Sequence, residues 1–219
     1  TLEAHAERLM LNPEVMDADW SELLERLQAD PAYASAFKAV YPDGLTKASV
    51  LDAVATYERS LVTPNSRFDH YLRGRREVLT EEERRGYRLF KSYGCVACHQ
   101  GMNIGGNMFQ KFGIFPYSPA PAHAGESDGR VDFGRFLITQ VERDRHVFRV
   151  PSLRNVALTA PYFHNGRAAT LESAVDTMAR VQLGKTLTSE EIGLIVSFLR
   201  TLTGEYQGQP LTTPPPESR

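Results

Sequence analysis

The sequence of 219 residues predicts a mostly α-helical protein whose helices are interrupted by a long irregular loop. Apolar residues recur every three or four positions in residues 46–62 and again in 189–203, which is the spacing of one buried helix face. Thr80 and Glu83 have the spacing of a capping box, so a helix should begin there. Residues 102–129 are rich in Gly, Pro and aromatic side chains, and a loop of this length usually has a function.

Seven helices are expected from periodicity and capping signals. Their ranges are 19–29, 31–40, 46–62, 66–73, 80–93, 170–180 and 189–203. The third should bury a stripe made of Val50, Val54, Tyr57 and Leu61, at positions i, i+4, i+7 and i+11. The last, which has a capping box of its own, should bury Ile192, Ile195, Val196, Leu199 and Leu202.

Composition excludes several classes of protein. The formal net charge is −2 and the pI is about 6.3, so bulk charge gives no reason to expect a nucleic acid or an anionic membrane as partner. No apolar run approaches the roughly 20 residues of a membrane span. Because the chain begins with Thr1 rather than Met, we expect it to be a processed or excised piece.

The strongest motif is GCVACHQG, which contains both cysteines of the chain, Cys95 and Cys98, followed at once by His99. C-x-x-C-H is the attachment signature of c-type haem: two thiols bind the porphyrin and the histidine ligates the iron. A structural zinc site would need about four ligands, a thioredoxin-like pair would need βαβ flanks, and a disulfide would leave His99 unexplained. The motif therefore predicts one covalently attached haem c. Since such haem is attached outside the bacterial cytoplasm, it also predicts a periplasmic protein.

A second axial ligand is expected, most often Met or His. Met102 is too close to His99 to reach the opposite haem face, whereas Met108 could reach it along the loop. Met178 follows Leu171 and Val175 at helical spacing, so periodicity alone favours a core residue at this position. His164 stands out among the histidines only because its segment is dense in motifs.

Four segments of the sequence narrow the choice of second axial ligand and of protein family. They are ERSLVTPNSRFDHYLRG, KSYGCVACHQGMNIGG, VFRVPSLRNVALTAPYFHNG and AVDTMARVQLG with the following LTSEEIGLIVSFLRTLTG. In this order they resemble the bacterial di-haem cytochrome c peroxidases, over nearly the whole chain. The related methylamine-utilisation di-haem enzymes carry Tyr where this chain has Met178. The resemblance therefore implies that Met178 is the second axial ligand, and a thioether ligand implies a high-potential haem.

The same resemblance implies further site residues. Arg149 and Arg154 match family positions close to the haem, where they would pair with its propionates. Thr159 and Pro161 match a turn whose main-chain carbonyls hold a calcium ion in the family, a chemically reasonable ligation of a hard cation. The alternatives without a function are that both arginines are ordinary surface residues and that the Thr159–Pro161 segment is only a turn.

The chain also departs from the family, which has two haem domains where this sequence has one C-x-x-C-H. Residues 1–75 are expected to be a helical segment that packs on an absent amino-terminal haem domain. Residues 76–204 should form the cytochrome c domain, and 205–219 a Pro-rich tail, extended or disordered. His5 stands where the family has a Gln of the peroxide pocket, and Val15 where it has a Glu. Val15 cannot move the proton that such a Glu would move.

Two functions remain open at this point. The first is the electron-transfer part of a peroxidase-like oxidoreductase, which takes electrons from a small cytochrome c or blue-copper protein. It would pass them to a second, peroxide-reducing haem on the absent domain, which converts hydrogen peroxide to water. The second is a mono-haem electron carrier without peroxidase activity, which the departures at His5 and Val15 favour. A homodimer is expected by family analogy only.

Overall fold

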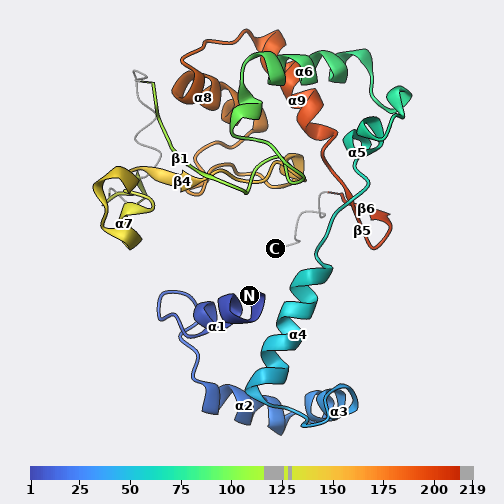
Figure 1. Cartoon of the computed structure of the whole chain (residues 1–219), viewed down its shortest axis with the longest axis vertical. Helices are drawn as coiled ribbons and strands as arrows, with labels where there is room; N and C mark the ends of the chain where they lie inside the picture. The colour runs from blue at the N-terminus through green and yellow to red at the C-terminus, as the bar shows by residue number, and fades with distance from the viewer. Residues whose placement is uncertain (116–125, 128–129, 213–219) are drawn as a thin grey trace, which may run out of the picture. The chain divides into compact units, whose positions relative to one another are not determined.

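The computed structural model describes residues 1–115, 126–127 and 130–212, and the chain divides into two compact units, Thr1–Val62 and Thr63–Arg219 (Figure 1). Unit 1 contains four helices, which are α1 (Leu2–Met10), α2 (Trp20–Ala29), α3 (Pro31–Val40) and α4 (Lys47–Ser60). The last three confirm the predicted helices. The first was not predicted, and it begins where the Thr1 side chain accepts a hydrogen bond from the amide of Ala4.

Helix α1 packs against α4 in unit 1, and only a small core results. Its buried apolar residues are Ala6, Val50, Leu51 and Ala55. The predicted stripe on α4 is therefore wrong in its second half, because Tyr57 is 62% exposed and Leu61 is 49% exposed. Unit 1 has too few residues to cover the whole length of this face.

Unit 2 consists of short helices joined by loops. The elements are α5 (Arg67–Leu72), η1 (Arg76–Val78), α6 (Glu81–Ser92), η2 (Cys95–Ala97), α7 (Phe136–Thr139), η3 (Glu142–Asp144), η4 (Val156–Leu158), α8 (Leu171–Leu183) and α9 (Ser189–Arg200). In the described residues, three antiparallel strand pairs accompany them: β1 (Phe109–Lys111) with β4 (Val147–Arg149), β2 (Glu126–Ser127) with β3 (Arg130–Val131), and β5 (Glu205–Tyr206) with β6 (Gln209–Pro210). The mostly α prediction and the remaining four helices are confirmed.

The core of unit 2 lies where α6 crosses α9 (Figure 1). Phe198 is 1% exposed and its ring contacts those of Phe68, Tyr87 and Phe90, with centroids 5.1–5.2 Å away. Gly86 permits the close crossing, because a Cβ there would lie 1.9 Å from the carbonyl oxygen of Leu194. The predicted stripe of α9 is confirmed, with Ile195, Val196, Leu199 and Leu202 buried and Ile192 half-buried.

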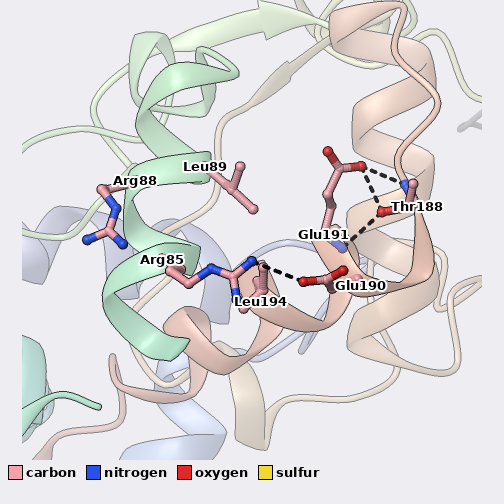
Figure 2. Close-up of a pocket in the computed structure, with 7 residues that line it drawn as sticks. All are labelled: Arg85, Arg88, Leu89, Thr188, Glu190, Glu191 and Leu194. Atoms are coloured by element: carbon pink, nitrogen blue, oxygen red, sulfur yellow. Dashed lines mark hydrogen bonds and ion pairs between the residues drawn. The ribbon is translucent and has the colours of Figure 1, made fainter. Parts of the chain in front are cut away.

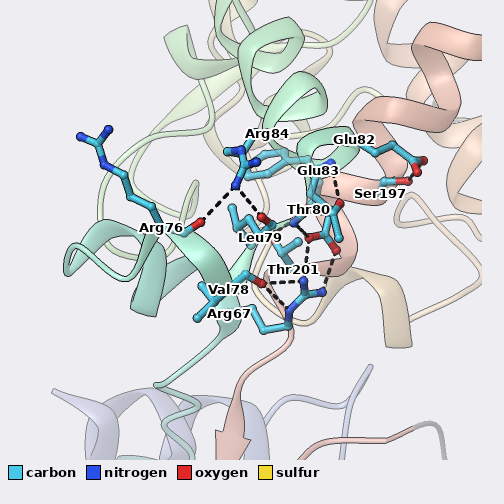
Figure 3. A network of polar contacts seen from close by, with 11 residues as sticks. Arg67, Arg76, Val78, Leu79, Thr80, Glu82, Glu83, Arg84, Ser197 and Thr201 are labelled. Atoms are coloured by element: carbon cyan, nitrogen blue, oxygen red, sulfur yellow. Dashed lines mark hydrogen bonds and ion pairs between the residues drawn. The ribbon is translucent and has the colours of Figure 1, made fainter.

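A polar network fixes the start of α6, which leads into the haem motif (Figure 3). Thr80 and Glu83 form the predicted capping box, in which the Glu83 carboxylate accepts from the Thr80 amide at 2.8 Å. Arg67 of α5 donates to both oxygens of that carboxylate, at 2.7 and 2.6 Å, and to the carbonyl of Val78. Helices α5 and α6 are therefore held together through one carboxylate.

The division between the units lies at Val62, whereas the expected amino-terminal segment ran to residue 75. Helix α5 lies in unit 2 because Phe68 is buried in its core and the amide of Phe68 donates to the carbonyl of Thr201. Residues 205–210 of the expected tail form the β5–β6 hairpin, while 213–219 and the loop residues 116–125 and 128–129 lie outside the described part. No helix in the described ranges is long and apolar enough to cross a membrane.

Candidate functional site

The two cysteines lie on the turn that follows α6, as predicted. Gly94 takes a left-handed conformation (φ 91°) that ends the helix, and η2 begins at Cys95. The amide of His99 donates to the carbonyl of Cys95 at 3.0 Å, so the motif folds back on itself. Both cysteines are free and half-buried, and burial raises the pKa of the Cys95 thiol to about 11. Two unbonded sulfur atoms and an imidazole are thus presented within five residues.

His99 is oriented by backbone carbonyls. Its Nδ1 lies 3.4 Å from the carbonyl oxygen of Ile104, and the carbonyl of Pro151 lies close enough to act on its pKa. Burial lowers the pKa of His99, against the opposing effect of these two carbonyls. A neutral imidazole that donates through Nδ1 keeps the lone pair on Nε2 for a metal.

Hydrogen bonds in both directions join the loop after His99 to the chain around β4. The amide of Gly106 donates to the carbonyl of Val150 at 2.8 Å, and the amide of Val150 donates to the carbonyl of Met108 at 3.0 Å. Arg149 adds two bonds from its guanidinium to the carbonyl of Gly106, at 3.1 and 2.8 Å. The Arg149 side chain is exposed. Its observed role is to bind the Gly106 carbonyl, and its role toward a haem propionate stays a prediction.

Arg154 has carboxylate and carbonyl partners of its own. Its guanidinium makes a two-pronged ion pair with Asp69 of α5, at 2.9 and 2.8 Å, and the two side chains are only 16% and 13% exposed. Its Nε also donates to the carbonyl of Met102, three residues after His99. Arg154 therefore ties α5 to the loop that follows the motif, and a propionate role stays a prediction.

Met178 lies in the middle of α8, and its side chain is half-buried. The core-facing residues of this helix are Leu171, Ala174, Ala179 and Val181. In the described part of the chain, Met178 belongs neither to the buried core cluster nor to the partly buried residues packed against it, whereas Val175 does pack there. This placement speaks against the core interpretation that periodicity alone favoured.

Comparison with known proteins identifies the family. The model of the di-haem cytochrome c peroxidases matches residues 1–77, and that of the di-haem oxidoreductases matches residues 41–186. The chain belongs to the di-haem cytochrome c peroxidase family. It is 44% identical to the cytochrome c551 peroxidase of Nitrosomonas europaea over 94% of its own length and 60% of that protein. It is 42% identical to the cytochrome c peroxidase Ccp of Escherichia coli, over 94% of this chain and 43% of that one.

A solved structure shares the fold of this family member. It is a MauG-like protein associated with microbial copper homeostasis, 28% identical, with a TM-score of 0.77 over 94% of this chain and 69% of that one. The chain spans about half the length of the curated relatives it matches. The comparison therefore establishes family and fold, and the activity of a whole peroxidase comes to this chain as a proposal.

The residues around the motif fit the haem c that the family implies. Cys95 and Cys98 are available for thioether bonds, and the orientation of His99 leaves Nε2 free as a ligand. The described residues hold no group of three or more His, Cys, Asp or Glu that could bind a metal ion, which leaves a zinc site without support there. Haem would supply the one-electron chemistry, while the protein binds and orients it.

Thr159 and Pro161 lie after η4 on an exposed turn that contains the cis peptide bond Ala160–Pro161. Their ligation of calcium through main-chain carbonyls stays a prediction. His164, the candidate singled out among the histidines, is stacked on Phe148 at 4.8 Å between ring centroids and lies 2.9 Å from an oxygen of Asp132. These contacts give it a structural role.

Three residues of the site were missed by sequence analysis: Gly105 and Pro151, which flank the imidazole of His99, and Asp69, which pairs with Arg154. Pro151 and Asp69 contact residues far away in the sequence, and Gly105 lies against Pro151, so no local pattern marks these three residues. A surface hollow of 380 Å³ between α6 and α9 is separate from these residues (Figure 2). Its lining is polar, with Arg85 paired to Glu190, and none of the predicted site residues lies in it.

Proposed function

We propose that this chain is the electron-transfer part of a cytochrome c peroxidase-like oxidoreductase and carries one haem c on Cys95 and Cys98. His99 and Met178 would be the axial ligands of its iron. The haem would take electrons from a small redox protein and pass them to a second haem. At that second haem, two electrons and two protons convert hydrogen peroxide to two molecules of water.

The observation that carries this proposal is the fixed imidazole of His99 beside two free thiols, in a chain of this family. Met178 supports it as a half-buried thioether outside the core. A His and Met ligand pair raises the reduction potential of a haem relative to two His ligands, which suits an electron-accepting site. Because the sequence has two cysteines, the second haem would have to be held by another segment of protein.

The finer features are proposals by analogy with the family. The donor would be a small cytochrome c or a blue-copper protein, the location the periplasm, and the assembly a homodimer. Arg149 and Arg154 would lie near the propionates, and the carbonyls of Thr159 and Pro161 would bind Ca²⁺. The four residue assignments rest on matching positions in the family, and the donor, the location and the assembly rest on analogy with it.

A second candidate function is that of a mono-haem electron carrier. His5 and Val15 favour it, because the peroxide pocket of the family has a Gln and a Glu at these positions. Both side chains are exposed in unit 1, Val15 by 55%. Neither residue supplies the carboxylate that proton transfer during O–O cleavage needs.

One experiment separates the two functions. Haem is counted per polypeptide in the native purified protein, and peroxide is then added together with reduced cytochrome c. Two haems with rapid oxidation of the donor support the peroxidase. One haem with reversible reduction and no peroxide-dependent turnover supports the carrier and overturns the peroxidase for this chain.

A further inference from the structure

Gly105 lies on the loop after the haem motif, against the chain that follows β4. It is buried, and its φ of +128° is rarely adopted by residues with a side chain. A Cβ built there would lie 2.0 Å from the carbonyl oxygen of Pro151 and 3.3 Å from Nδ1 of His99. The first distance is a collision with backbone, so any side chain would force the two segments apart.

We propose that Gly105 is a positioning residue for the haem ligand His99: its missing side chain lets the Pro151 carbonyl approach the Nδ1 edge of the imidazole, where it shares the Nδ1 proton with the carbonyl of Ile104. The inference rests on the proposed function, in which His99 ligates the iron. A hydrogen bond at Nδ1 fixes the orientation of a ligating imidazole and makes it a stronger electron donor. A stronger donor stabilises the oxidised iron and lowers the reduction potential.

Position 105 requires glycine for its positive φ and also because a side chain would collide with its neighbours. Among the described glycines, Gly105 is the one whose added Cβ would meet the imidazole of His99. Its neighbour Gly106 also has a positive φ, of +81°, yet a Cβ there would only touch the Arg149 side chain at 3.6 Å. The two glycines share one loop and differ in what a methyl group would displace, so Gly106 provides a matched control.

The test compares Gly105→Ala with Gly106→Ala in the haem-loaded full chain. The reduction potential is measured by optical titration, and the Nδ1 proton of His99 is followed by NMR in the reduced, diamagnetic state. Gly105→Ala should raise the potential and speed the exchange of the Nδ1 proton with solvent at least tenfold. Gly106→Ala should lose some stability through its backbone strain and leave both readouts as in the wild type.

A second variant keeps the inference testable if Gly105→Ala does not accumulate with haem. Pro151→Ala retains the carbonyl and removes the ring that restricts its backbone. It should shift the potential and the proton exchange in the same direction by less. If neither available variant changes these readouts relative to Gly106→Ala, Gly105 is only a turn residue and the inference is overturned. Neither readout uses peroxide, so its failure is distinguishable from failure of the peroxidase proposal.

Discussion

The two units of the chain differ in how completely their apolar side chains are buried. Unit 2 has a continuous core in which Phe68, Phe90 and Phe198 are at most 5% exposed. Unit 1 has no comparable cluster, and large apolar side chains such as Val40 and Tyr57 are exposed. Within the described residues, its Trp20 Nε1 and Glu58 Oε2 are buried without a hydrogen-bond partner.

The difference shows which unit can support a site by itself. A rigid core beneath the haem motif holds α6 and η2 in place, so that His99 and its carbonyl partners keep their geometry. Unit 1 has 62 residues and a small core, so its free energy of unfolding should be small. We expect perturbations of the unit 2 core to reach the haem site.

The largest effect is expected at the centre of the unit 2 core. Phe198→Ala should lower the free energy of unfolding of unit 2 by about 3–5 kcal/mol, because it removes a fully buried ring and leaves a cavity. Tyr57→Ala, on the exposed face of α4, is the control and should change it by less than about 0.5 kcal/mol. Urea unfolding followed by haem absorbance measures both. Equal losses would contradict the contrast between the units.

A smaller effect should follow from adding one methyl group at the α6–α9 crossing. Gly86→Ala should destabilise unit 2 by about 1–3 kcal/mol, because the new Cβ meets the Leu194 carbonyl. Gly193→Ala on α9 has open space around it and should stabilise the helix by about 0.5–1 kcal/mol. Thermal unfolding of the two variants should therefore shift in opposite directions. Shifts of the same sign would mean that the helices do not cross this closely.

The Asp69–Arg154 pair should contribute about 1–2 kcal/mol, which Asp69→Asn would remove. Burial raises the pKa of Asp69, but hydrogen bonds from Arg154 and Ser66 outweigh it and hold this pKa below its usual value. A depressed folded-state pKa gives stability that is present above the unfolded-state pKa of about 3.9 and is lost as the pH falls through the folded-state value.

The urea midpoint measured between pH 7 and pH 2 checks this dependence. The wild type should lose more stability than Asp69→Asn as the pH falls below about 4. The gap between the two proteins should therefore close in acid. A gap that stays constant from neutral to acid pH would show that the pair contributes no charge-dependent stability.

The smallest effect is expected at the surface hollow of Figure 2. Glu190→Gln removes the exposed ion pair with Arg85, 3.0 Å long, and should cost less than about 1 kcal/mol, with the loss vanishing at high salt. Thermal unfolding at low and high salt measures it. A loss that persists at high salt would indicate a role for this hollow beyond surface charge.

Local signals made most of the helices predictable. The capping box of Thr80 and Glu83 located the start of α6, and that of Thr188 located α9, because such signals depend on neighbours in the sequence. Helix α1 was missed although Leu2, Ala6 and Leu9 recur at helical spacing. Tyr57 was misjudged because periodicity predicts a face and says nothing of whether enough protein is present to cover it.

The candidate site was only partly predictable for the same reason. The motif identified Cys95, Cys98 and His99 directly. The Pro151 carbonyl beside His99 and the Asp69 partner of Arg154 depend on contacts between segments about 50 and 85 residues apart. Met178 could be interpreted as a core residue or as a ligand from the sequence; its place outside the core cluster speaks against the first, and its role as a ligand stays a prediction.

The most direct test of the account is the charge-transfer band between thioether sulfur and ferric iron, near the red end of the visible spectrum. It is measured in the oxidised, haem-loaded wild type, Met178→Ala and Met108→Ala, with Met108 as the half-buried control. The account predicts that Met178→Ala loses the band and has a lower reduction potential, whereas Met108→Ala keeps both. A band that survives in Met178→Ala, or disappears in Met108→Ala, would contradict the ligand pair on which the proposed function rests.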